Sequence, residues 1–130
     1  LPRISIAELN HKHIIITGGT GFFGYWLLSL FDILSRRGFS IRVTVLSRSP
    51  EKFIARAPTF SACGWLRWLK GDVLAFPELG PADLMIHAAT DTSAEAHRKP
   101  LKIMDDILLG TRLALDRAVP DGIRTAPLLP

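Results

Sequence analysis

The stretch IIITGGTGFFG, from Ile14 to Gly24, decides the fold of this chain. It runs from an apolar, β-branched segment into four closely spaced glycines. Glycine loses more backbone freedom on folding than any other residue, which costs about 0.5–1 kcal/mol at each position. We therefore expect a turn in which bare backbone has a specific use.

The glycines lie between a predicted strand and a predicted helix. His13–Thr17 is a continuous apolar run, typical of a strand that is buried on both faces. Phe22–Arg37 then changes to helical spacing, with arginines in the last turn and Gly38 directly after it. A strand, a glycine turn and a helix in one βαβ unit are the context in which G-x-G-x-x-G predicts dinucleotide binding.

Further strands and helices alternate along the chain. We predict strands at 41–46, 65–72 and 84–88, a short helix that begins at Pro50, and a long helix at 100–119. The fold class is therefore α/β, a doubly wound parallel sheet of the Rossmann type, truncated after about the fourth strand and the helix that follows it.

Three segments are predicted along the chain: a lead-in at 1–12, the Rossmann segment at 13–124 and a tail at 125–130. The tail is separated because APLLP, with two prolines, is a poor central strand.

The glycine turn has a predicted role in binding a pyrophosphate. One glycine makes the turn, the next lets backbone N–H groups approach the phosphates, and the third lets helix and strand pack closely. The start of the helix adds unpaired N–H groups and the positive end of its dipole. The predicted cofactor-binding residues of this unit are Gly18, Thr20, Gly21, Phe22, Phe23 and Gly24. No Gly-Lys-Ser/Thr follows, so a P-loop is excluded; a glycine turn that serves packing alone is the alternative.

TGGTGFFG also resembles the signature of the extended short-chain dehydrogenase/reductase family, the nucleotide-sugar epimerases and dehydratases. LKGDV is similar to the end of that family's third strand, LMIHAAT to its fourth strand, and DDILLGTRLALDRA to the helix that follows. The resemblance covers about residues 12–124. It implies the family's Rossmann fold, a nicotinamide cofactor and a nucleotide-sugar substrate.

The resemblance also implies positions along the cofactor. Asp72 and Val73 would flank the adenine, and Ala88, Ala89 and Thr90 would lie along the dinucleotide. Thr90 and Thr92 would lie near the nicotinamide and the sugar, although a solvated loop is the alternative. His87, at the end of the fourth strand, is interpreted as a packed residue rather than a catalytic one.

The residues that follow the second strand bear on the choice of cofactor. In dinucleotide folds an acidic residue there binds the ribose 2′-hydroxyl of NAD. This chain has Ser47 and Arg48 instead, and an arginine can pair with the 2′-phosphate of NADP. The sequence therefore favours NADP over NAD, with stacking on adenine or exposure to solvent as the other interpretations of Arg48.

No catalytic residue is predicted within this chain. The family uses a Tyr-x-x-x-Lys pair, but the single tyrosine, Tyr25, is followed four positions later by Ser29. We interpret Tyr25 as a packing residue. The expected function is that of the NAD(P)-binding segment of a nucleotide-sugar epimerase or dehydratase, an oxidoreductase or lyase with dTDP-glucose 4,6-dehydratase as the best guess. The alternative is a non-catalytic NAD(P)-binding sensor or scaffold.

Composition and charge limit the classes of binding partner that are expected for this chain. The 130 residues are 48% hydrophobic and 22% charged, a globular composition. The net charge of +4 comes from dispersed cations, so a nucleic-acid surface is not expected. No apolar run is long enough for a membrane span, so a membrane segment is not expected either. The single cysteine, Cys63, fits a cytoplasmic protein, and His11 and His13 lack the further ligands of a metal site. The helix at 100–119 is apolar on two sides and predicts a homodimer.

Overall fold

The computed structural model describes residues 5–18, 21–75, 77–88, 98, 100–118 and 124–127. The elements are η1 (Ile6–Leu9), β1 (His13–Thr17), α1 (Phe22–Arg36), β2 (Arg42–Ser47), α2 (Pro50–Arg56), η2 (Pro58–Ser61), β3 (Leu66–Lys70), β4 (Leu84–His87), α4 (Pro100–Ala118) and β5 (Arg124–Pro127). The predicted alternation of strands and helices is thus confirmed, with bounds that differ by one or two residues.

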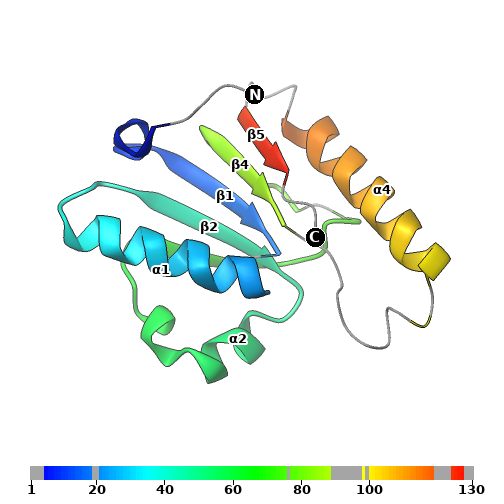
Figure 1. Cartoon of the computed structure of the whole chain (residues 1–130), viewed down its shortest axis with the longest axis horizontal. Coiled ribbons are helices and arrows are strands. Elements are labelled where there is room, and N and C mark those ends of the chain that lie inside the picture. The colour runs from blue at the N-terminus through cyan, green and yellow to red at the C-terminus, as the bar shows by residue number, and fades with distance from the viewer. Residues whose placement is uncertain are drawn as a thin grey trace.

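The strands form one five-stranded sheet in the order β3-β2-β1-β4-β5. Each pairing in this sheet is parallel. The chain moves outward from β1 to β3, then returns to the other side of β1 to form β4 and β5, so the strand order reverses between β1 and β4 (Figure 1). In open α/β sheets, ligands bind at such a switch point, beyond the carboxyl ends of the strands.

Helices cover the two faces of the sheet separately (Figure 1). Ile14 and Ile16 of β1 face α1, where they join a buried cluster with Leu28 and Phe31. Ile15 points to the opposite face and belongs to a second cluster with Ala114 of α4. Because both faces are covered, β1 carries apolar side chains in an unbroken run, as the sequence indicated.

The end of α1 follows the predicted glycine stop. The Gly38 backbone has φ +95°, which is the left-handed region. The N–H of Phe39 donates to the carbonyl of Leu34 over 3.0 Å, and the N–H of Gly38 donates to the carbonyl of Ser35 over 3.1 Å. These bonds satisfy carbonyl groups that the helix leaves unpaired, and they turn the chain toward β2.

The last strand differs from the sequence prediction. Thr125, Ala126 and Pro127 pair with Met85, Ile86 and His87 of β4, so a parallel strand continues past the predicted boundary at residue 124. The predicted doubly wound sheet is thus extended after α4 by one further parallel strand. A proline is tolerated because β5 is an edge strand of the sheet and Pro127 is its last residue.

The left-handed backbone of Gly38 gives a test of the fold. An added Cβ at Gly38 would meet no heavy atom within 4 Å, so Gly38→Ala tests backbone strain without a steric clash. We expect this variant to lower the free energy of unfolding by about 1 kcal/mol. Urea denaturation measures the change.

Gly64 provides the matched control, because a Cβ there is also free of contacts within 4 Å and its φ is not positive. Gly64→Ala should stay within about 0.5 kcal/mol of the parent chain. Equal losses at the two positions would contradict strain at Gly38 as the cause.

Candidate functional site

The glycine turn after β1 stands at the switch point of the sheet. Gly18 has φ +74°, and its N–H donates to the carbonyl of Leu46 in β2 over 3.2 Å. The N–H of Gly21 then donates back to the carbonyl of Gly18 over 3.3 Å. Gly18 therefore occupies a conformation that L side chains rarely adopt. Gly19 and Thr20 lie outside the described residues.

The first turn of α1 opens directly from this glycine turn. Gly21 is the N-cap in an extended conformation, and among the described residues no side chain donates or accepts a hydrogen bond at this cap. The N–H of Tyr25 makes the first bond of the helix, to the carbonyl of Gly21 over 3.0 Å. The first N–H groups of any α-helix have no acceptor within that helix. This end of α1 is suited to an anion.

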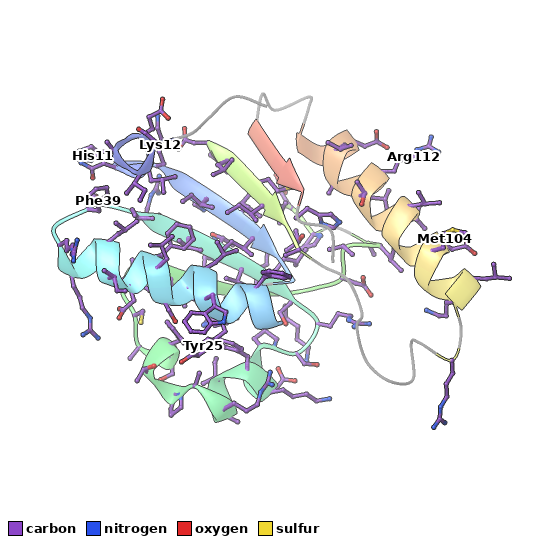
Figure 2. The ribbon with its side chains drawn as sticks, viewed as in Figure 1. His11, Lys12, Tyr25, Phe39, Met104 and Arg112 are labelled. Carbon is purple, nitrogen blue, oxygen red and sulfur yellow. The ribbon has the colours of Figure 1, made fainter. Side chains whose placement is uncertain are left out.

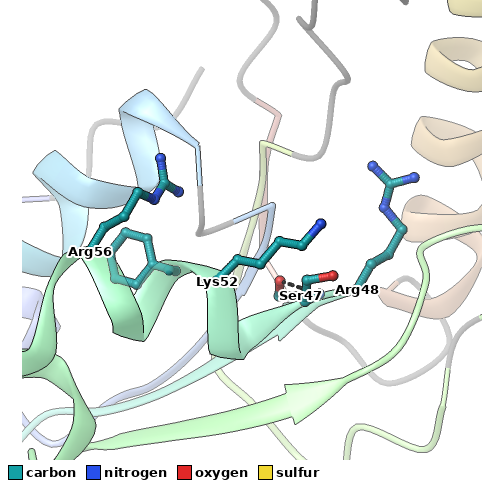
Figure 3. A pocket seen from close by; sticks show the side chains of 6 residues that line it. Ser47, Arg48, Lys52 and Arg56 are labelled. Atoms are coloured by element: carbon teal, nitrogen blue, oxygen red, sulfur yellow. Dashed lines mark hydrogen bonds between the residues drawn. The ribbon is translucent and has the colours of Figure 1, made fainter.

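A cationic pocket lies where β2 meets α2 (Figure 3). Its volume is about 490 Å³, and it is lined by Ser47, Arg48, Ser49, Lys52, Phe53 and Arg56. Ser47 is buried, and its hydroxyl oxygen accepts a hydrogen bond from the N–H of Ser49 over 3.1 Å. Arg48 is exposed and also lines the pocket. The structure thus places the two residues predicted to choose the cofactor in one pocket.

Asp72 and Val73 follow β3 at the same edge of the sheet. The Asp72 carboxylate accepts the N–H of Leu74 over 3.0 Å, and its carbonyl accepts the N–H of Ala75 over 3.1 Å, which fixes a turn. A Cβ at Gly71, just before this turn, would lie 2.9 Å from a methyl group of Leu46, so a larger residue there would make that side chain shift. Val73 is half-buried and faces Gly110 of α4, where an added Cβ would lie 3.5 Å away.

A buried side-chain pair joins the ends of β1 and β4. Thr17 and His87 are register partners, and the Thr17 hydroxyl lies 2.6 Å from His87 Nδ1. Thr17 is 0% exposed and His87 is 6% exposed. Burial lowers the pKa of the His87 imidazole below its usual value of 6.5. His87 is therefore a packed residue that favours its neutral form, in agreement with the interpretation from sequence.

Of the remaining positions that the sequence analysis singled out, some pack within the fold and others lie outside the described residues. Ala88 donates its N–H to the carbonyl of Thr17 over 2.9 Å, which continues the β1–β4 pairing. Ala89, Thr90 and Thr92 lie outside the described residues. Tyr25 belongs to α1, and its ring points toward α2 (Figure 2), with the ring centroid 6.4 Å from that of Phe53 and 6.2 Å from that of Phe60. Its position is consistent with packing.

His13 and Cys63 have structural rather than chemical roles. His13 Nδ1 lies 2.7 Å from the carbonyl oxygen of Pro81, and Nε2 lies 2.8 Å from the hydroxyl of Thr44. The backbone N–H of His13 also donates to the Asp83 carboxylate over 2.8 Å. Burial raises the pKa of the Cys63 thiol, which disfavours the reactive thiolate. Among the described residues no group of histidine, cysteine and carboxylate side chains could hold a metal ion.

Sequence reasoning missed two residues of the pocket, Lys52 and Arg56. Both lie on α2, and their spacing of four positions could have indicated one shared face of the helix. It also missed the contact between Thr17 and His87, which are 70 positions apart along the chain.

Several solved proteins have the same fold. The chain is similar to Pen from Bacillus thuringiensis, with 22% identity and a TM-score of 0.71 over 88% of this chain and 36% of that one. A UDP-Glc/GlcNAc 4-epimerase from Campylobacter jejuni matches with 19% identity and a TM-score of 0.69, over 86% and 35% of the two chains. A dTDP-glucose 4,6-dehydratase from Streptomyces venezuelae, solved with NAD and TYD bound, matches with 20% identity and a TM-score of 0.64, over 85% and 37%.

These likenesses confirm the predicted fold, a doubly wound parallel sheet of the Rossmann type. The chain spans little more than a third of the length of the solved proteins it matches. No protein-family model and no curated protein matches the sequence. Within the described part of the chain, no helix is long and apolar enough to cross a membrane.

The buried histidine gives a prediction about pH. The pKa of His87 is lower in the folded chain than in the unfolded one. At pH values between these two pKa values, the unfolded chain therefore binds more protons than the folded chain. The contribution of neutral His87 to stability is fully present above pH 6.5, the usual value, and is lost as the pH falls toward the folded pKa. We expect His87→Gln to flatten the rise of unfolding free energy with pH below that value, as measured by urea denaturation.

Thr17→Val separates the hydrogen bond from the titration. It removes the partner hydroxyl but leaves His87 buried, so it should cost about 1 kcal/mol at every pH and keep the slope. Parallel stability curves for His87→Gln and the parent chain would show that another group carries the pH dependence.

Proposed function

We propose that this chain is the NAD(P)-binding segment of an extended short-chain dehydrogenase/reductase, acting in a nucleotide-sugar epimerase or dehydratase. The observation that carries the proposal is the glycine turn, which opens α1 at the point where the strand order reverses. Its support is fourfold: the left-handed Gly18, the N-cap without a side-chain bond, the cationic pocket beside it, and the fold shared with an NAD-bound dehydratase.

The residues of the carboxyl edge fit a dinucleotide. The first N–H groups of α1 would bind the pyrophosphate, with Gly21 leaving the approach clear of side chains. The turn at Asp72 and Val73 would border the adenine, and Ala88 would border the cofactor beyond β4. A nicotinamide cofactor would supply hydride chemistry at a carbinol carbon of the sugar, and this chain would supply position and electrostatics.

The finer assignments rest on the resemblance. A dTDP-glucose 4,6-dehydratase-like reaction, and hence a lyase, is the preferred reading, and a similar enzyme is among the solved proteins of the same fold. The nucleotide sugar would bind to residues outside this chain together with the segment around Thr90 and Thr92. The cytoplasm is the proposed location, with neither nucleic acid nor membrane as a partner.

NADP is preferred over NAD because of Arg48. Its guanidinium group lines the pocket that follows β2, where an acidic residue would bind the ribose of NAD. The NAD bound to the similar dehydratase supports the wider statement, that a nicotinamide dinucleotide binds here.

A non-catalytic NAD(P)-binding sensor or scaffold is the second candidate. The observation that favours it is the lack of a Tyr-x-x-x-Lys pair in these 130 residues. Sequencing the complete coding region discriminates between the two, because a Tyr-x-x-x-Lys further along would restore the enzyme.

A substitution at Gly21 tests dinucleotide binding without changing the stability of the fold. It is the N-cap, its backbone is extended, and an added Cβ would lie 3.7 Å from the carbonyl oxygen of Gly18, an ordinary contact. Gly21→Asp should therefore keep the melting temperature, since aspartate is a good N-cap. It should weaken binding of NADH and NADPH by at least about tenfold, because the carboxylate repels the pyrophosphate.

Fluorescence titration with each reduced dinucleotide measures the effect. Gly21→Asn is the matched control, with the same shape and no charge, and should bind more tightly than Gly21→Asp. Failure of the folded parent chain to bind either dinucleotide, or equal binding by the aspartate and asparagine variants, would contradict the proposal.

A homodimer through α4 is also proposed. Leu101, Met104, Leu108 and Leu115 are exposed and recur at spacings of three, four and seven, which places them in one stripe away from the sheet. Figure 2 shows Met104 on the side of α4 that faces away from the strands. Burying such a stripe against a second copy would remove apolar surface from water.

Leu108→Glu tests the dimer. Sedimentation velocity should show the parent chain as a dimer and this variant at least about tenfold weaker in association, since a buried charge costs several kcal/mol. Lys102→Glu, a charge change beside the stripe, should leave association nearly unchanged. A parent chain that sediments as a monomer at high concentration would rule out this interface.

A further inference from the structure

The outer side of α1 carries a stripe of apolar side chains that remains exposed. Leu28, Phe31 and Leu34 of this helix are buried against the sheet. A helix needs one apolar side to pack on a sheet, and α1 has a second. Exposed apolar residues recur there at spacings of three, four and three positions, which defines the α1 stripe: Phe23, Trp26, Leu30 and Ile33.

The aromatic part of the α1 stripe is braced by the fold. The rings of Trp26 and Tyr25 contact each other edge to face, with centroids 5.8 Å apart and planes at 82°. Tyr25 packs in turn on Phe53 and Phe60, and Figure 2 shows it pointing toward α2. A side chain whose position is already restricted loses less freedom when a partner covers it.

The exposed area of the α1 stripe indicates what kind of contact it can make. Trp26 is 59% exposed and Phe23 is 52% exposed. Each ring therefore leaves roughly 100 Å² in water, and the whole stripe leaves roughly 300–400 Å². A contiguous apolar patch of this size is typical of an interaction site. It is too small for a permanent dimer and fits a weak, reversible association.

The spacing of the α1 stripe makes it complementary to itself. When two copies of α1 pack antiparallel about a two-fold axis near residue 28, Trp26 of one copy lies opposite Leu30 of the second copy. Phe23 then lies opposite Ile33 of the second copy. Each aromatic ring thus meets a smaller aliphatic side chain, and spacings of three and four are those of paired helices.

Charge favours the antiparallel pair over the parallel one. Arg37 comes four positions after Ile33, in line with the α1 stripe, and is exposed. A parallel pair would bring the two Arg37 side chains together, and like charges at neighbouring positions repel each other. An antiparallel pair keeps them at opposite ends and also places opposite ends of the helix dipoles side by side.

We propose that the α1 stripe is a self-association surface, on which a second copy of this chain packs its own α1 in the antiparallel direction. The stripe belongs to the helix that packs on Ile14 and Ile16, whereas α4 covers the opposite face of the sheet (Figure 1). The inference is therefore independent of the dimer proposed through α4 and of dinucleotide binding. A chain that uses both surfaces would form assemblies larger than a dimer, since each surface pairs with a copy of itself.

The test is made in the Leu108→Glu chain, in which the surface proposed on α4 is already disrupted. Sedimentation velocity over a concentration series should show reversible association of this chain, with a dissociation constant roughly in the micromolar range. Adding Trp26→Glu or Leu30→Lys should weaken it at least about tenfold, because each substitution puts a charge into an apolar contact.

Ile6→Glu is the matched control. Ile6 is an exposed apolar residue of η1, away from α1, and it is 55% exposed. The substitution brings the same charge as Trp26→Glu and should leave the association nearly unchanged. Melting temperatures should stay close to that of the Leu108→Glu chain for all three variants, since exposed positions are changed.

A mixture of the two α1 variants tests the direction and register of the pair. In an antiparallel pair the carboxylate introduced by Trp26→Glu would face the amine introduced by Leu30→Lys. The second contact would be a native pair of Trp26 and Leu30. The mixture should therefore associate at least about tenfold more tightly than either variant alone, and unfolded chains could not produce this recovery.

The outcomes decide the inference in either direction. Recovery on mixing supports the antiparallel pair, even where the parent chain binds neither dinucleotide and the proposed function falls. A Leu108→Glu chain that sediments as a monomer at every concentration overturns the inference. Equal weakening by Ile6→Glu, or a mixture that associates no better than its components, overturns it as well.

Discussion

The parallel pairing of β1 with β2 on one side and β4 on the other is the constraint on which the rest of the structure depends. Because β1 is central and covered on both faces, its chain can leave the sheet only at the carboxyl edge, and Gly18 makes that exit with a left-handed backbone. The hydrogen bonds from Gly18 to Leu46 and from Ala88 to Thr17 then hold the three strands together at the switch point. The candidate site follows from this geometry.

Much of the fold could be predicted because local patterns and burial agree. His13–Thr17 has the bounds expected from its apolar run, and Gly38 ends α1 as its position indicated. The fifth strand could not be read from local sequence. Its pairing with β4 includes Pro127, a residue type that argues against a strand, and only the topology shows that this strand lies at an edge, where a proline is tolerated.

The parts of the site that follow from the order of elements along the chain could be predicted. Contacts between residues far apart in the sequence could not. The glycine turn and the positions after β2, β3 and β4 follow from the rule that parallel strands end at one edge. The pairing of Thr17 with His87 joins residues 70 positions apart, and no local pattern encodes it. Lys52 and Arg56 of α2 line one pocket with Ser47 of β2, and that placement depends on how the helix packs beside the strand.

The two edges of the sheet are secured in different ways. At the amino edge, His13 is tied through its backbone and both ring nitrogens to Asp83, Pro81 and Thr44, which come from two other parts of the chain. The turns at the carboxyl edge rely more on backbone bonds and glycine conformations. The amino edge is therefore held by the side chain and backbone of one residue, His13, and the turns of the carboxyl edge are held mainly by the backbone. A substitution of His13 would therefore disturb three contacts at once, whereas a substitution of a side chain in the Gly18–Gly21 turn would leave the backbone bonds of the carboxyl edge in place.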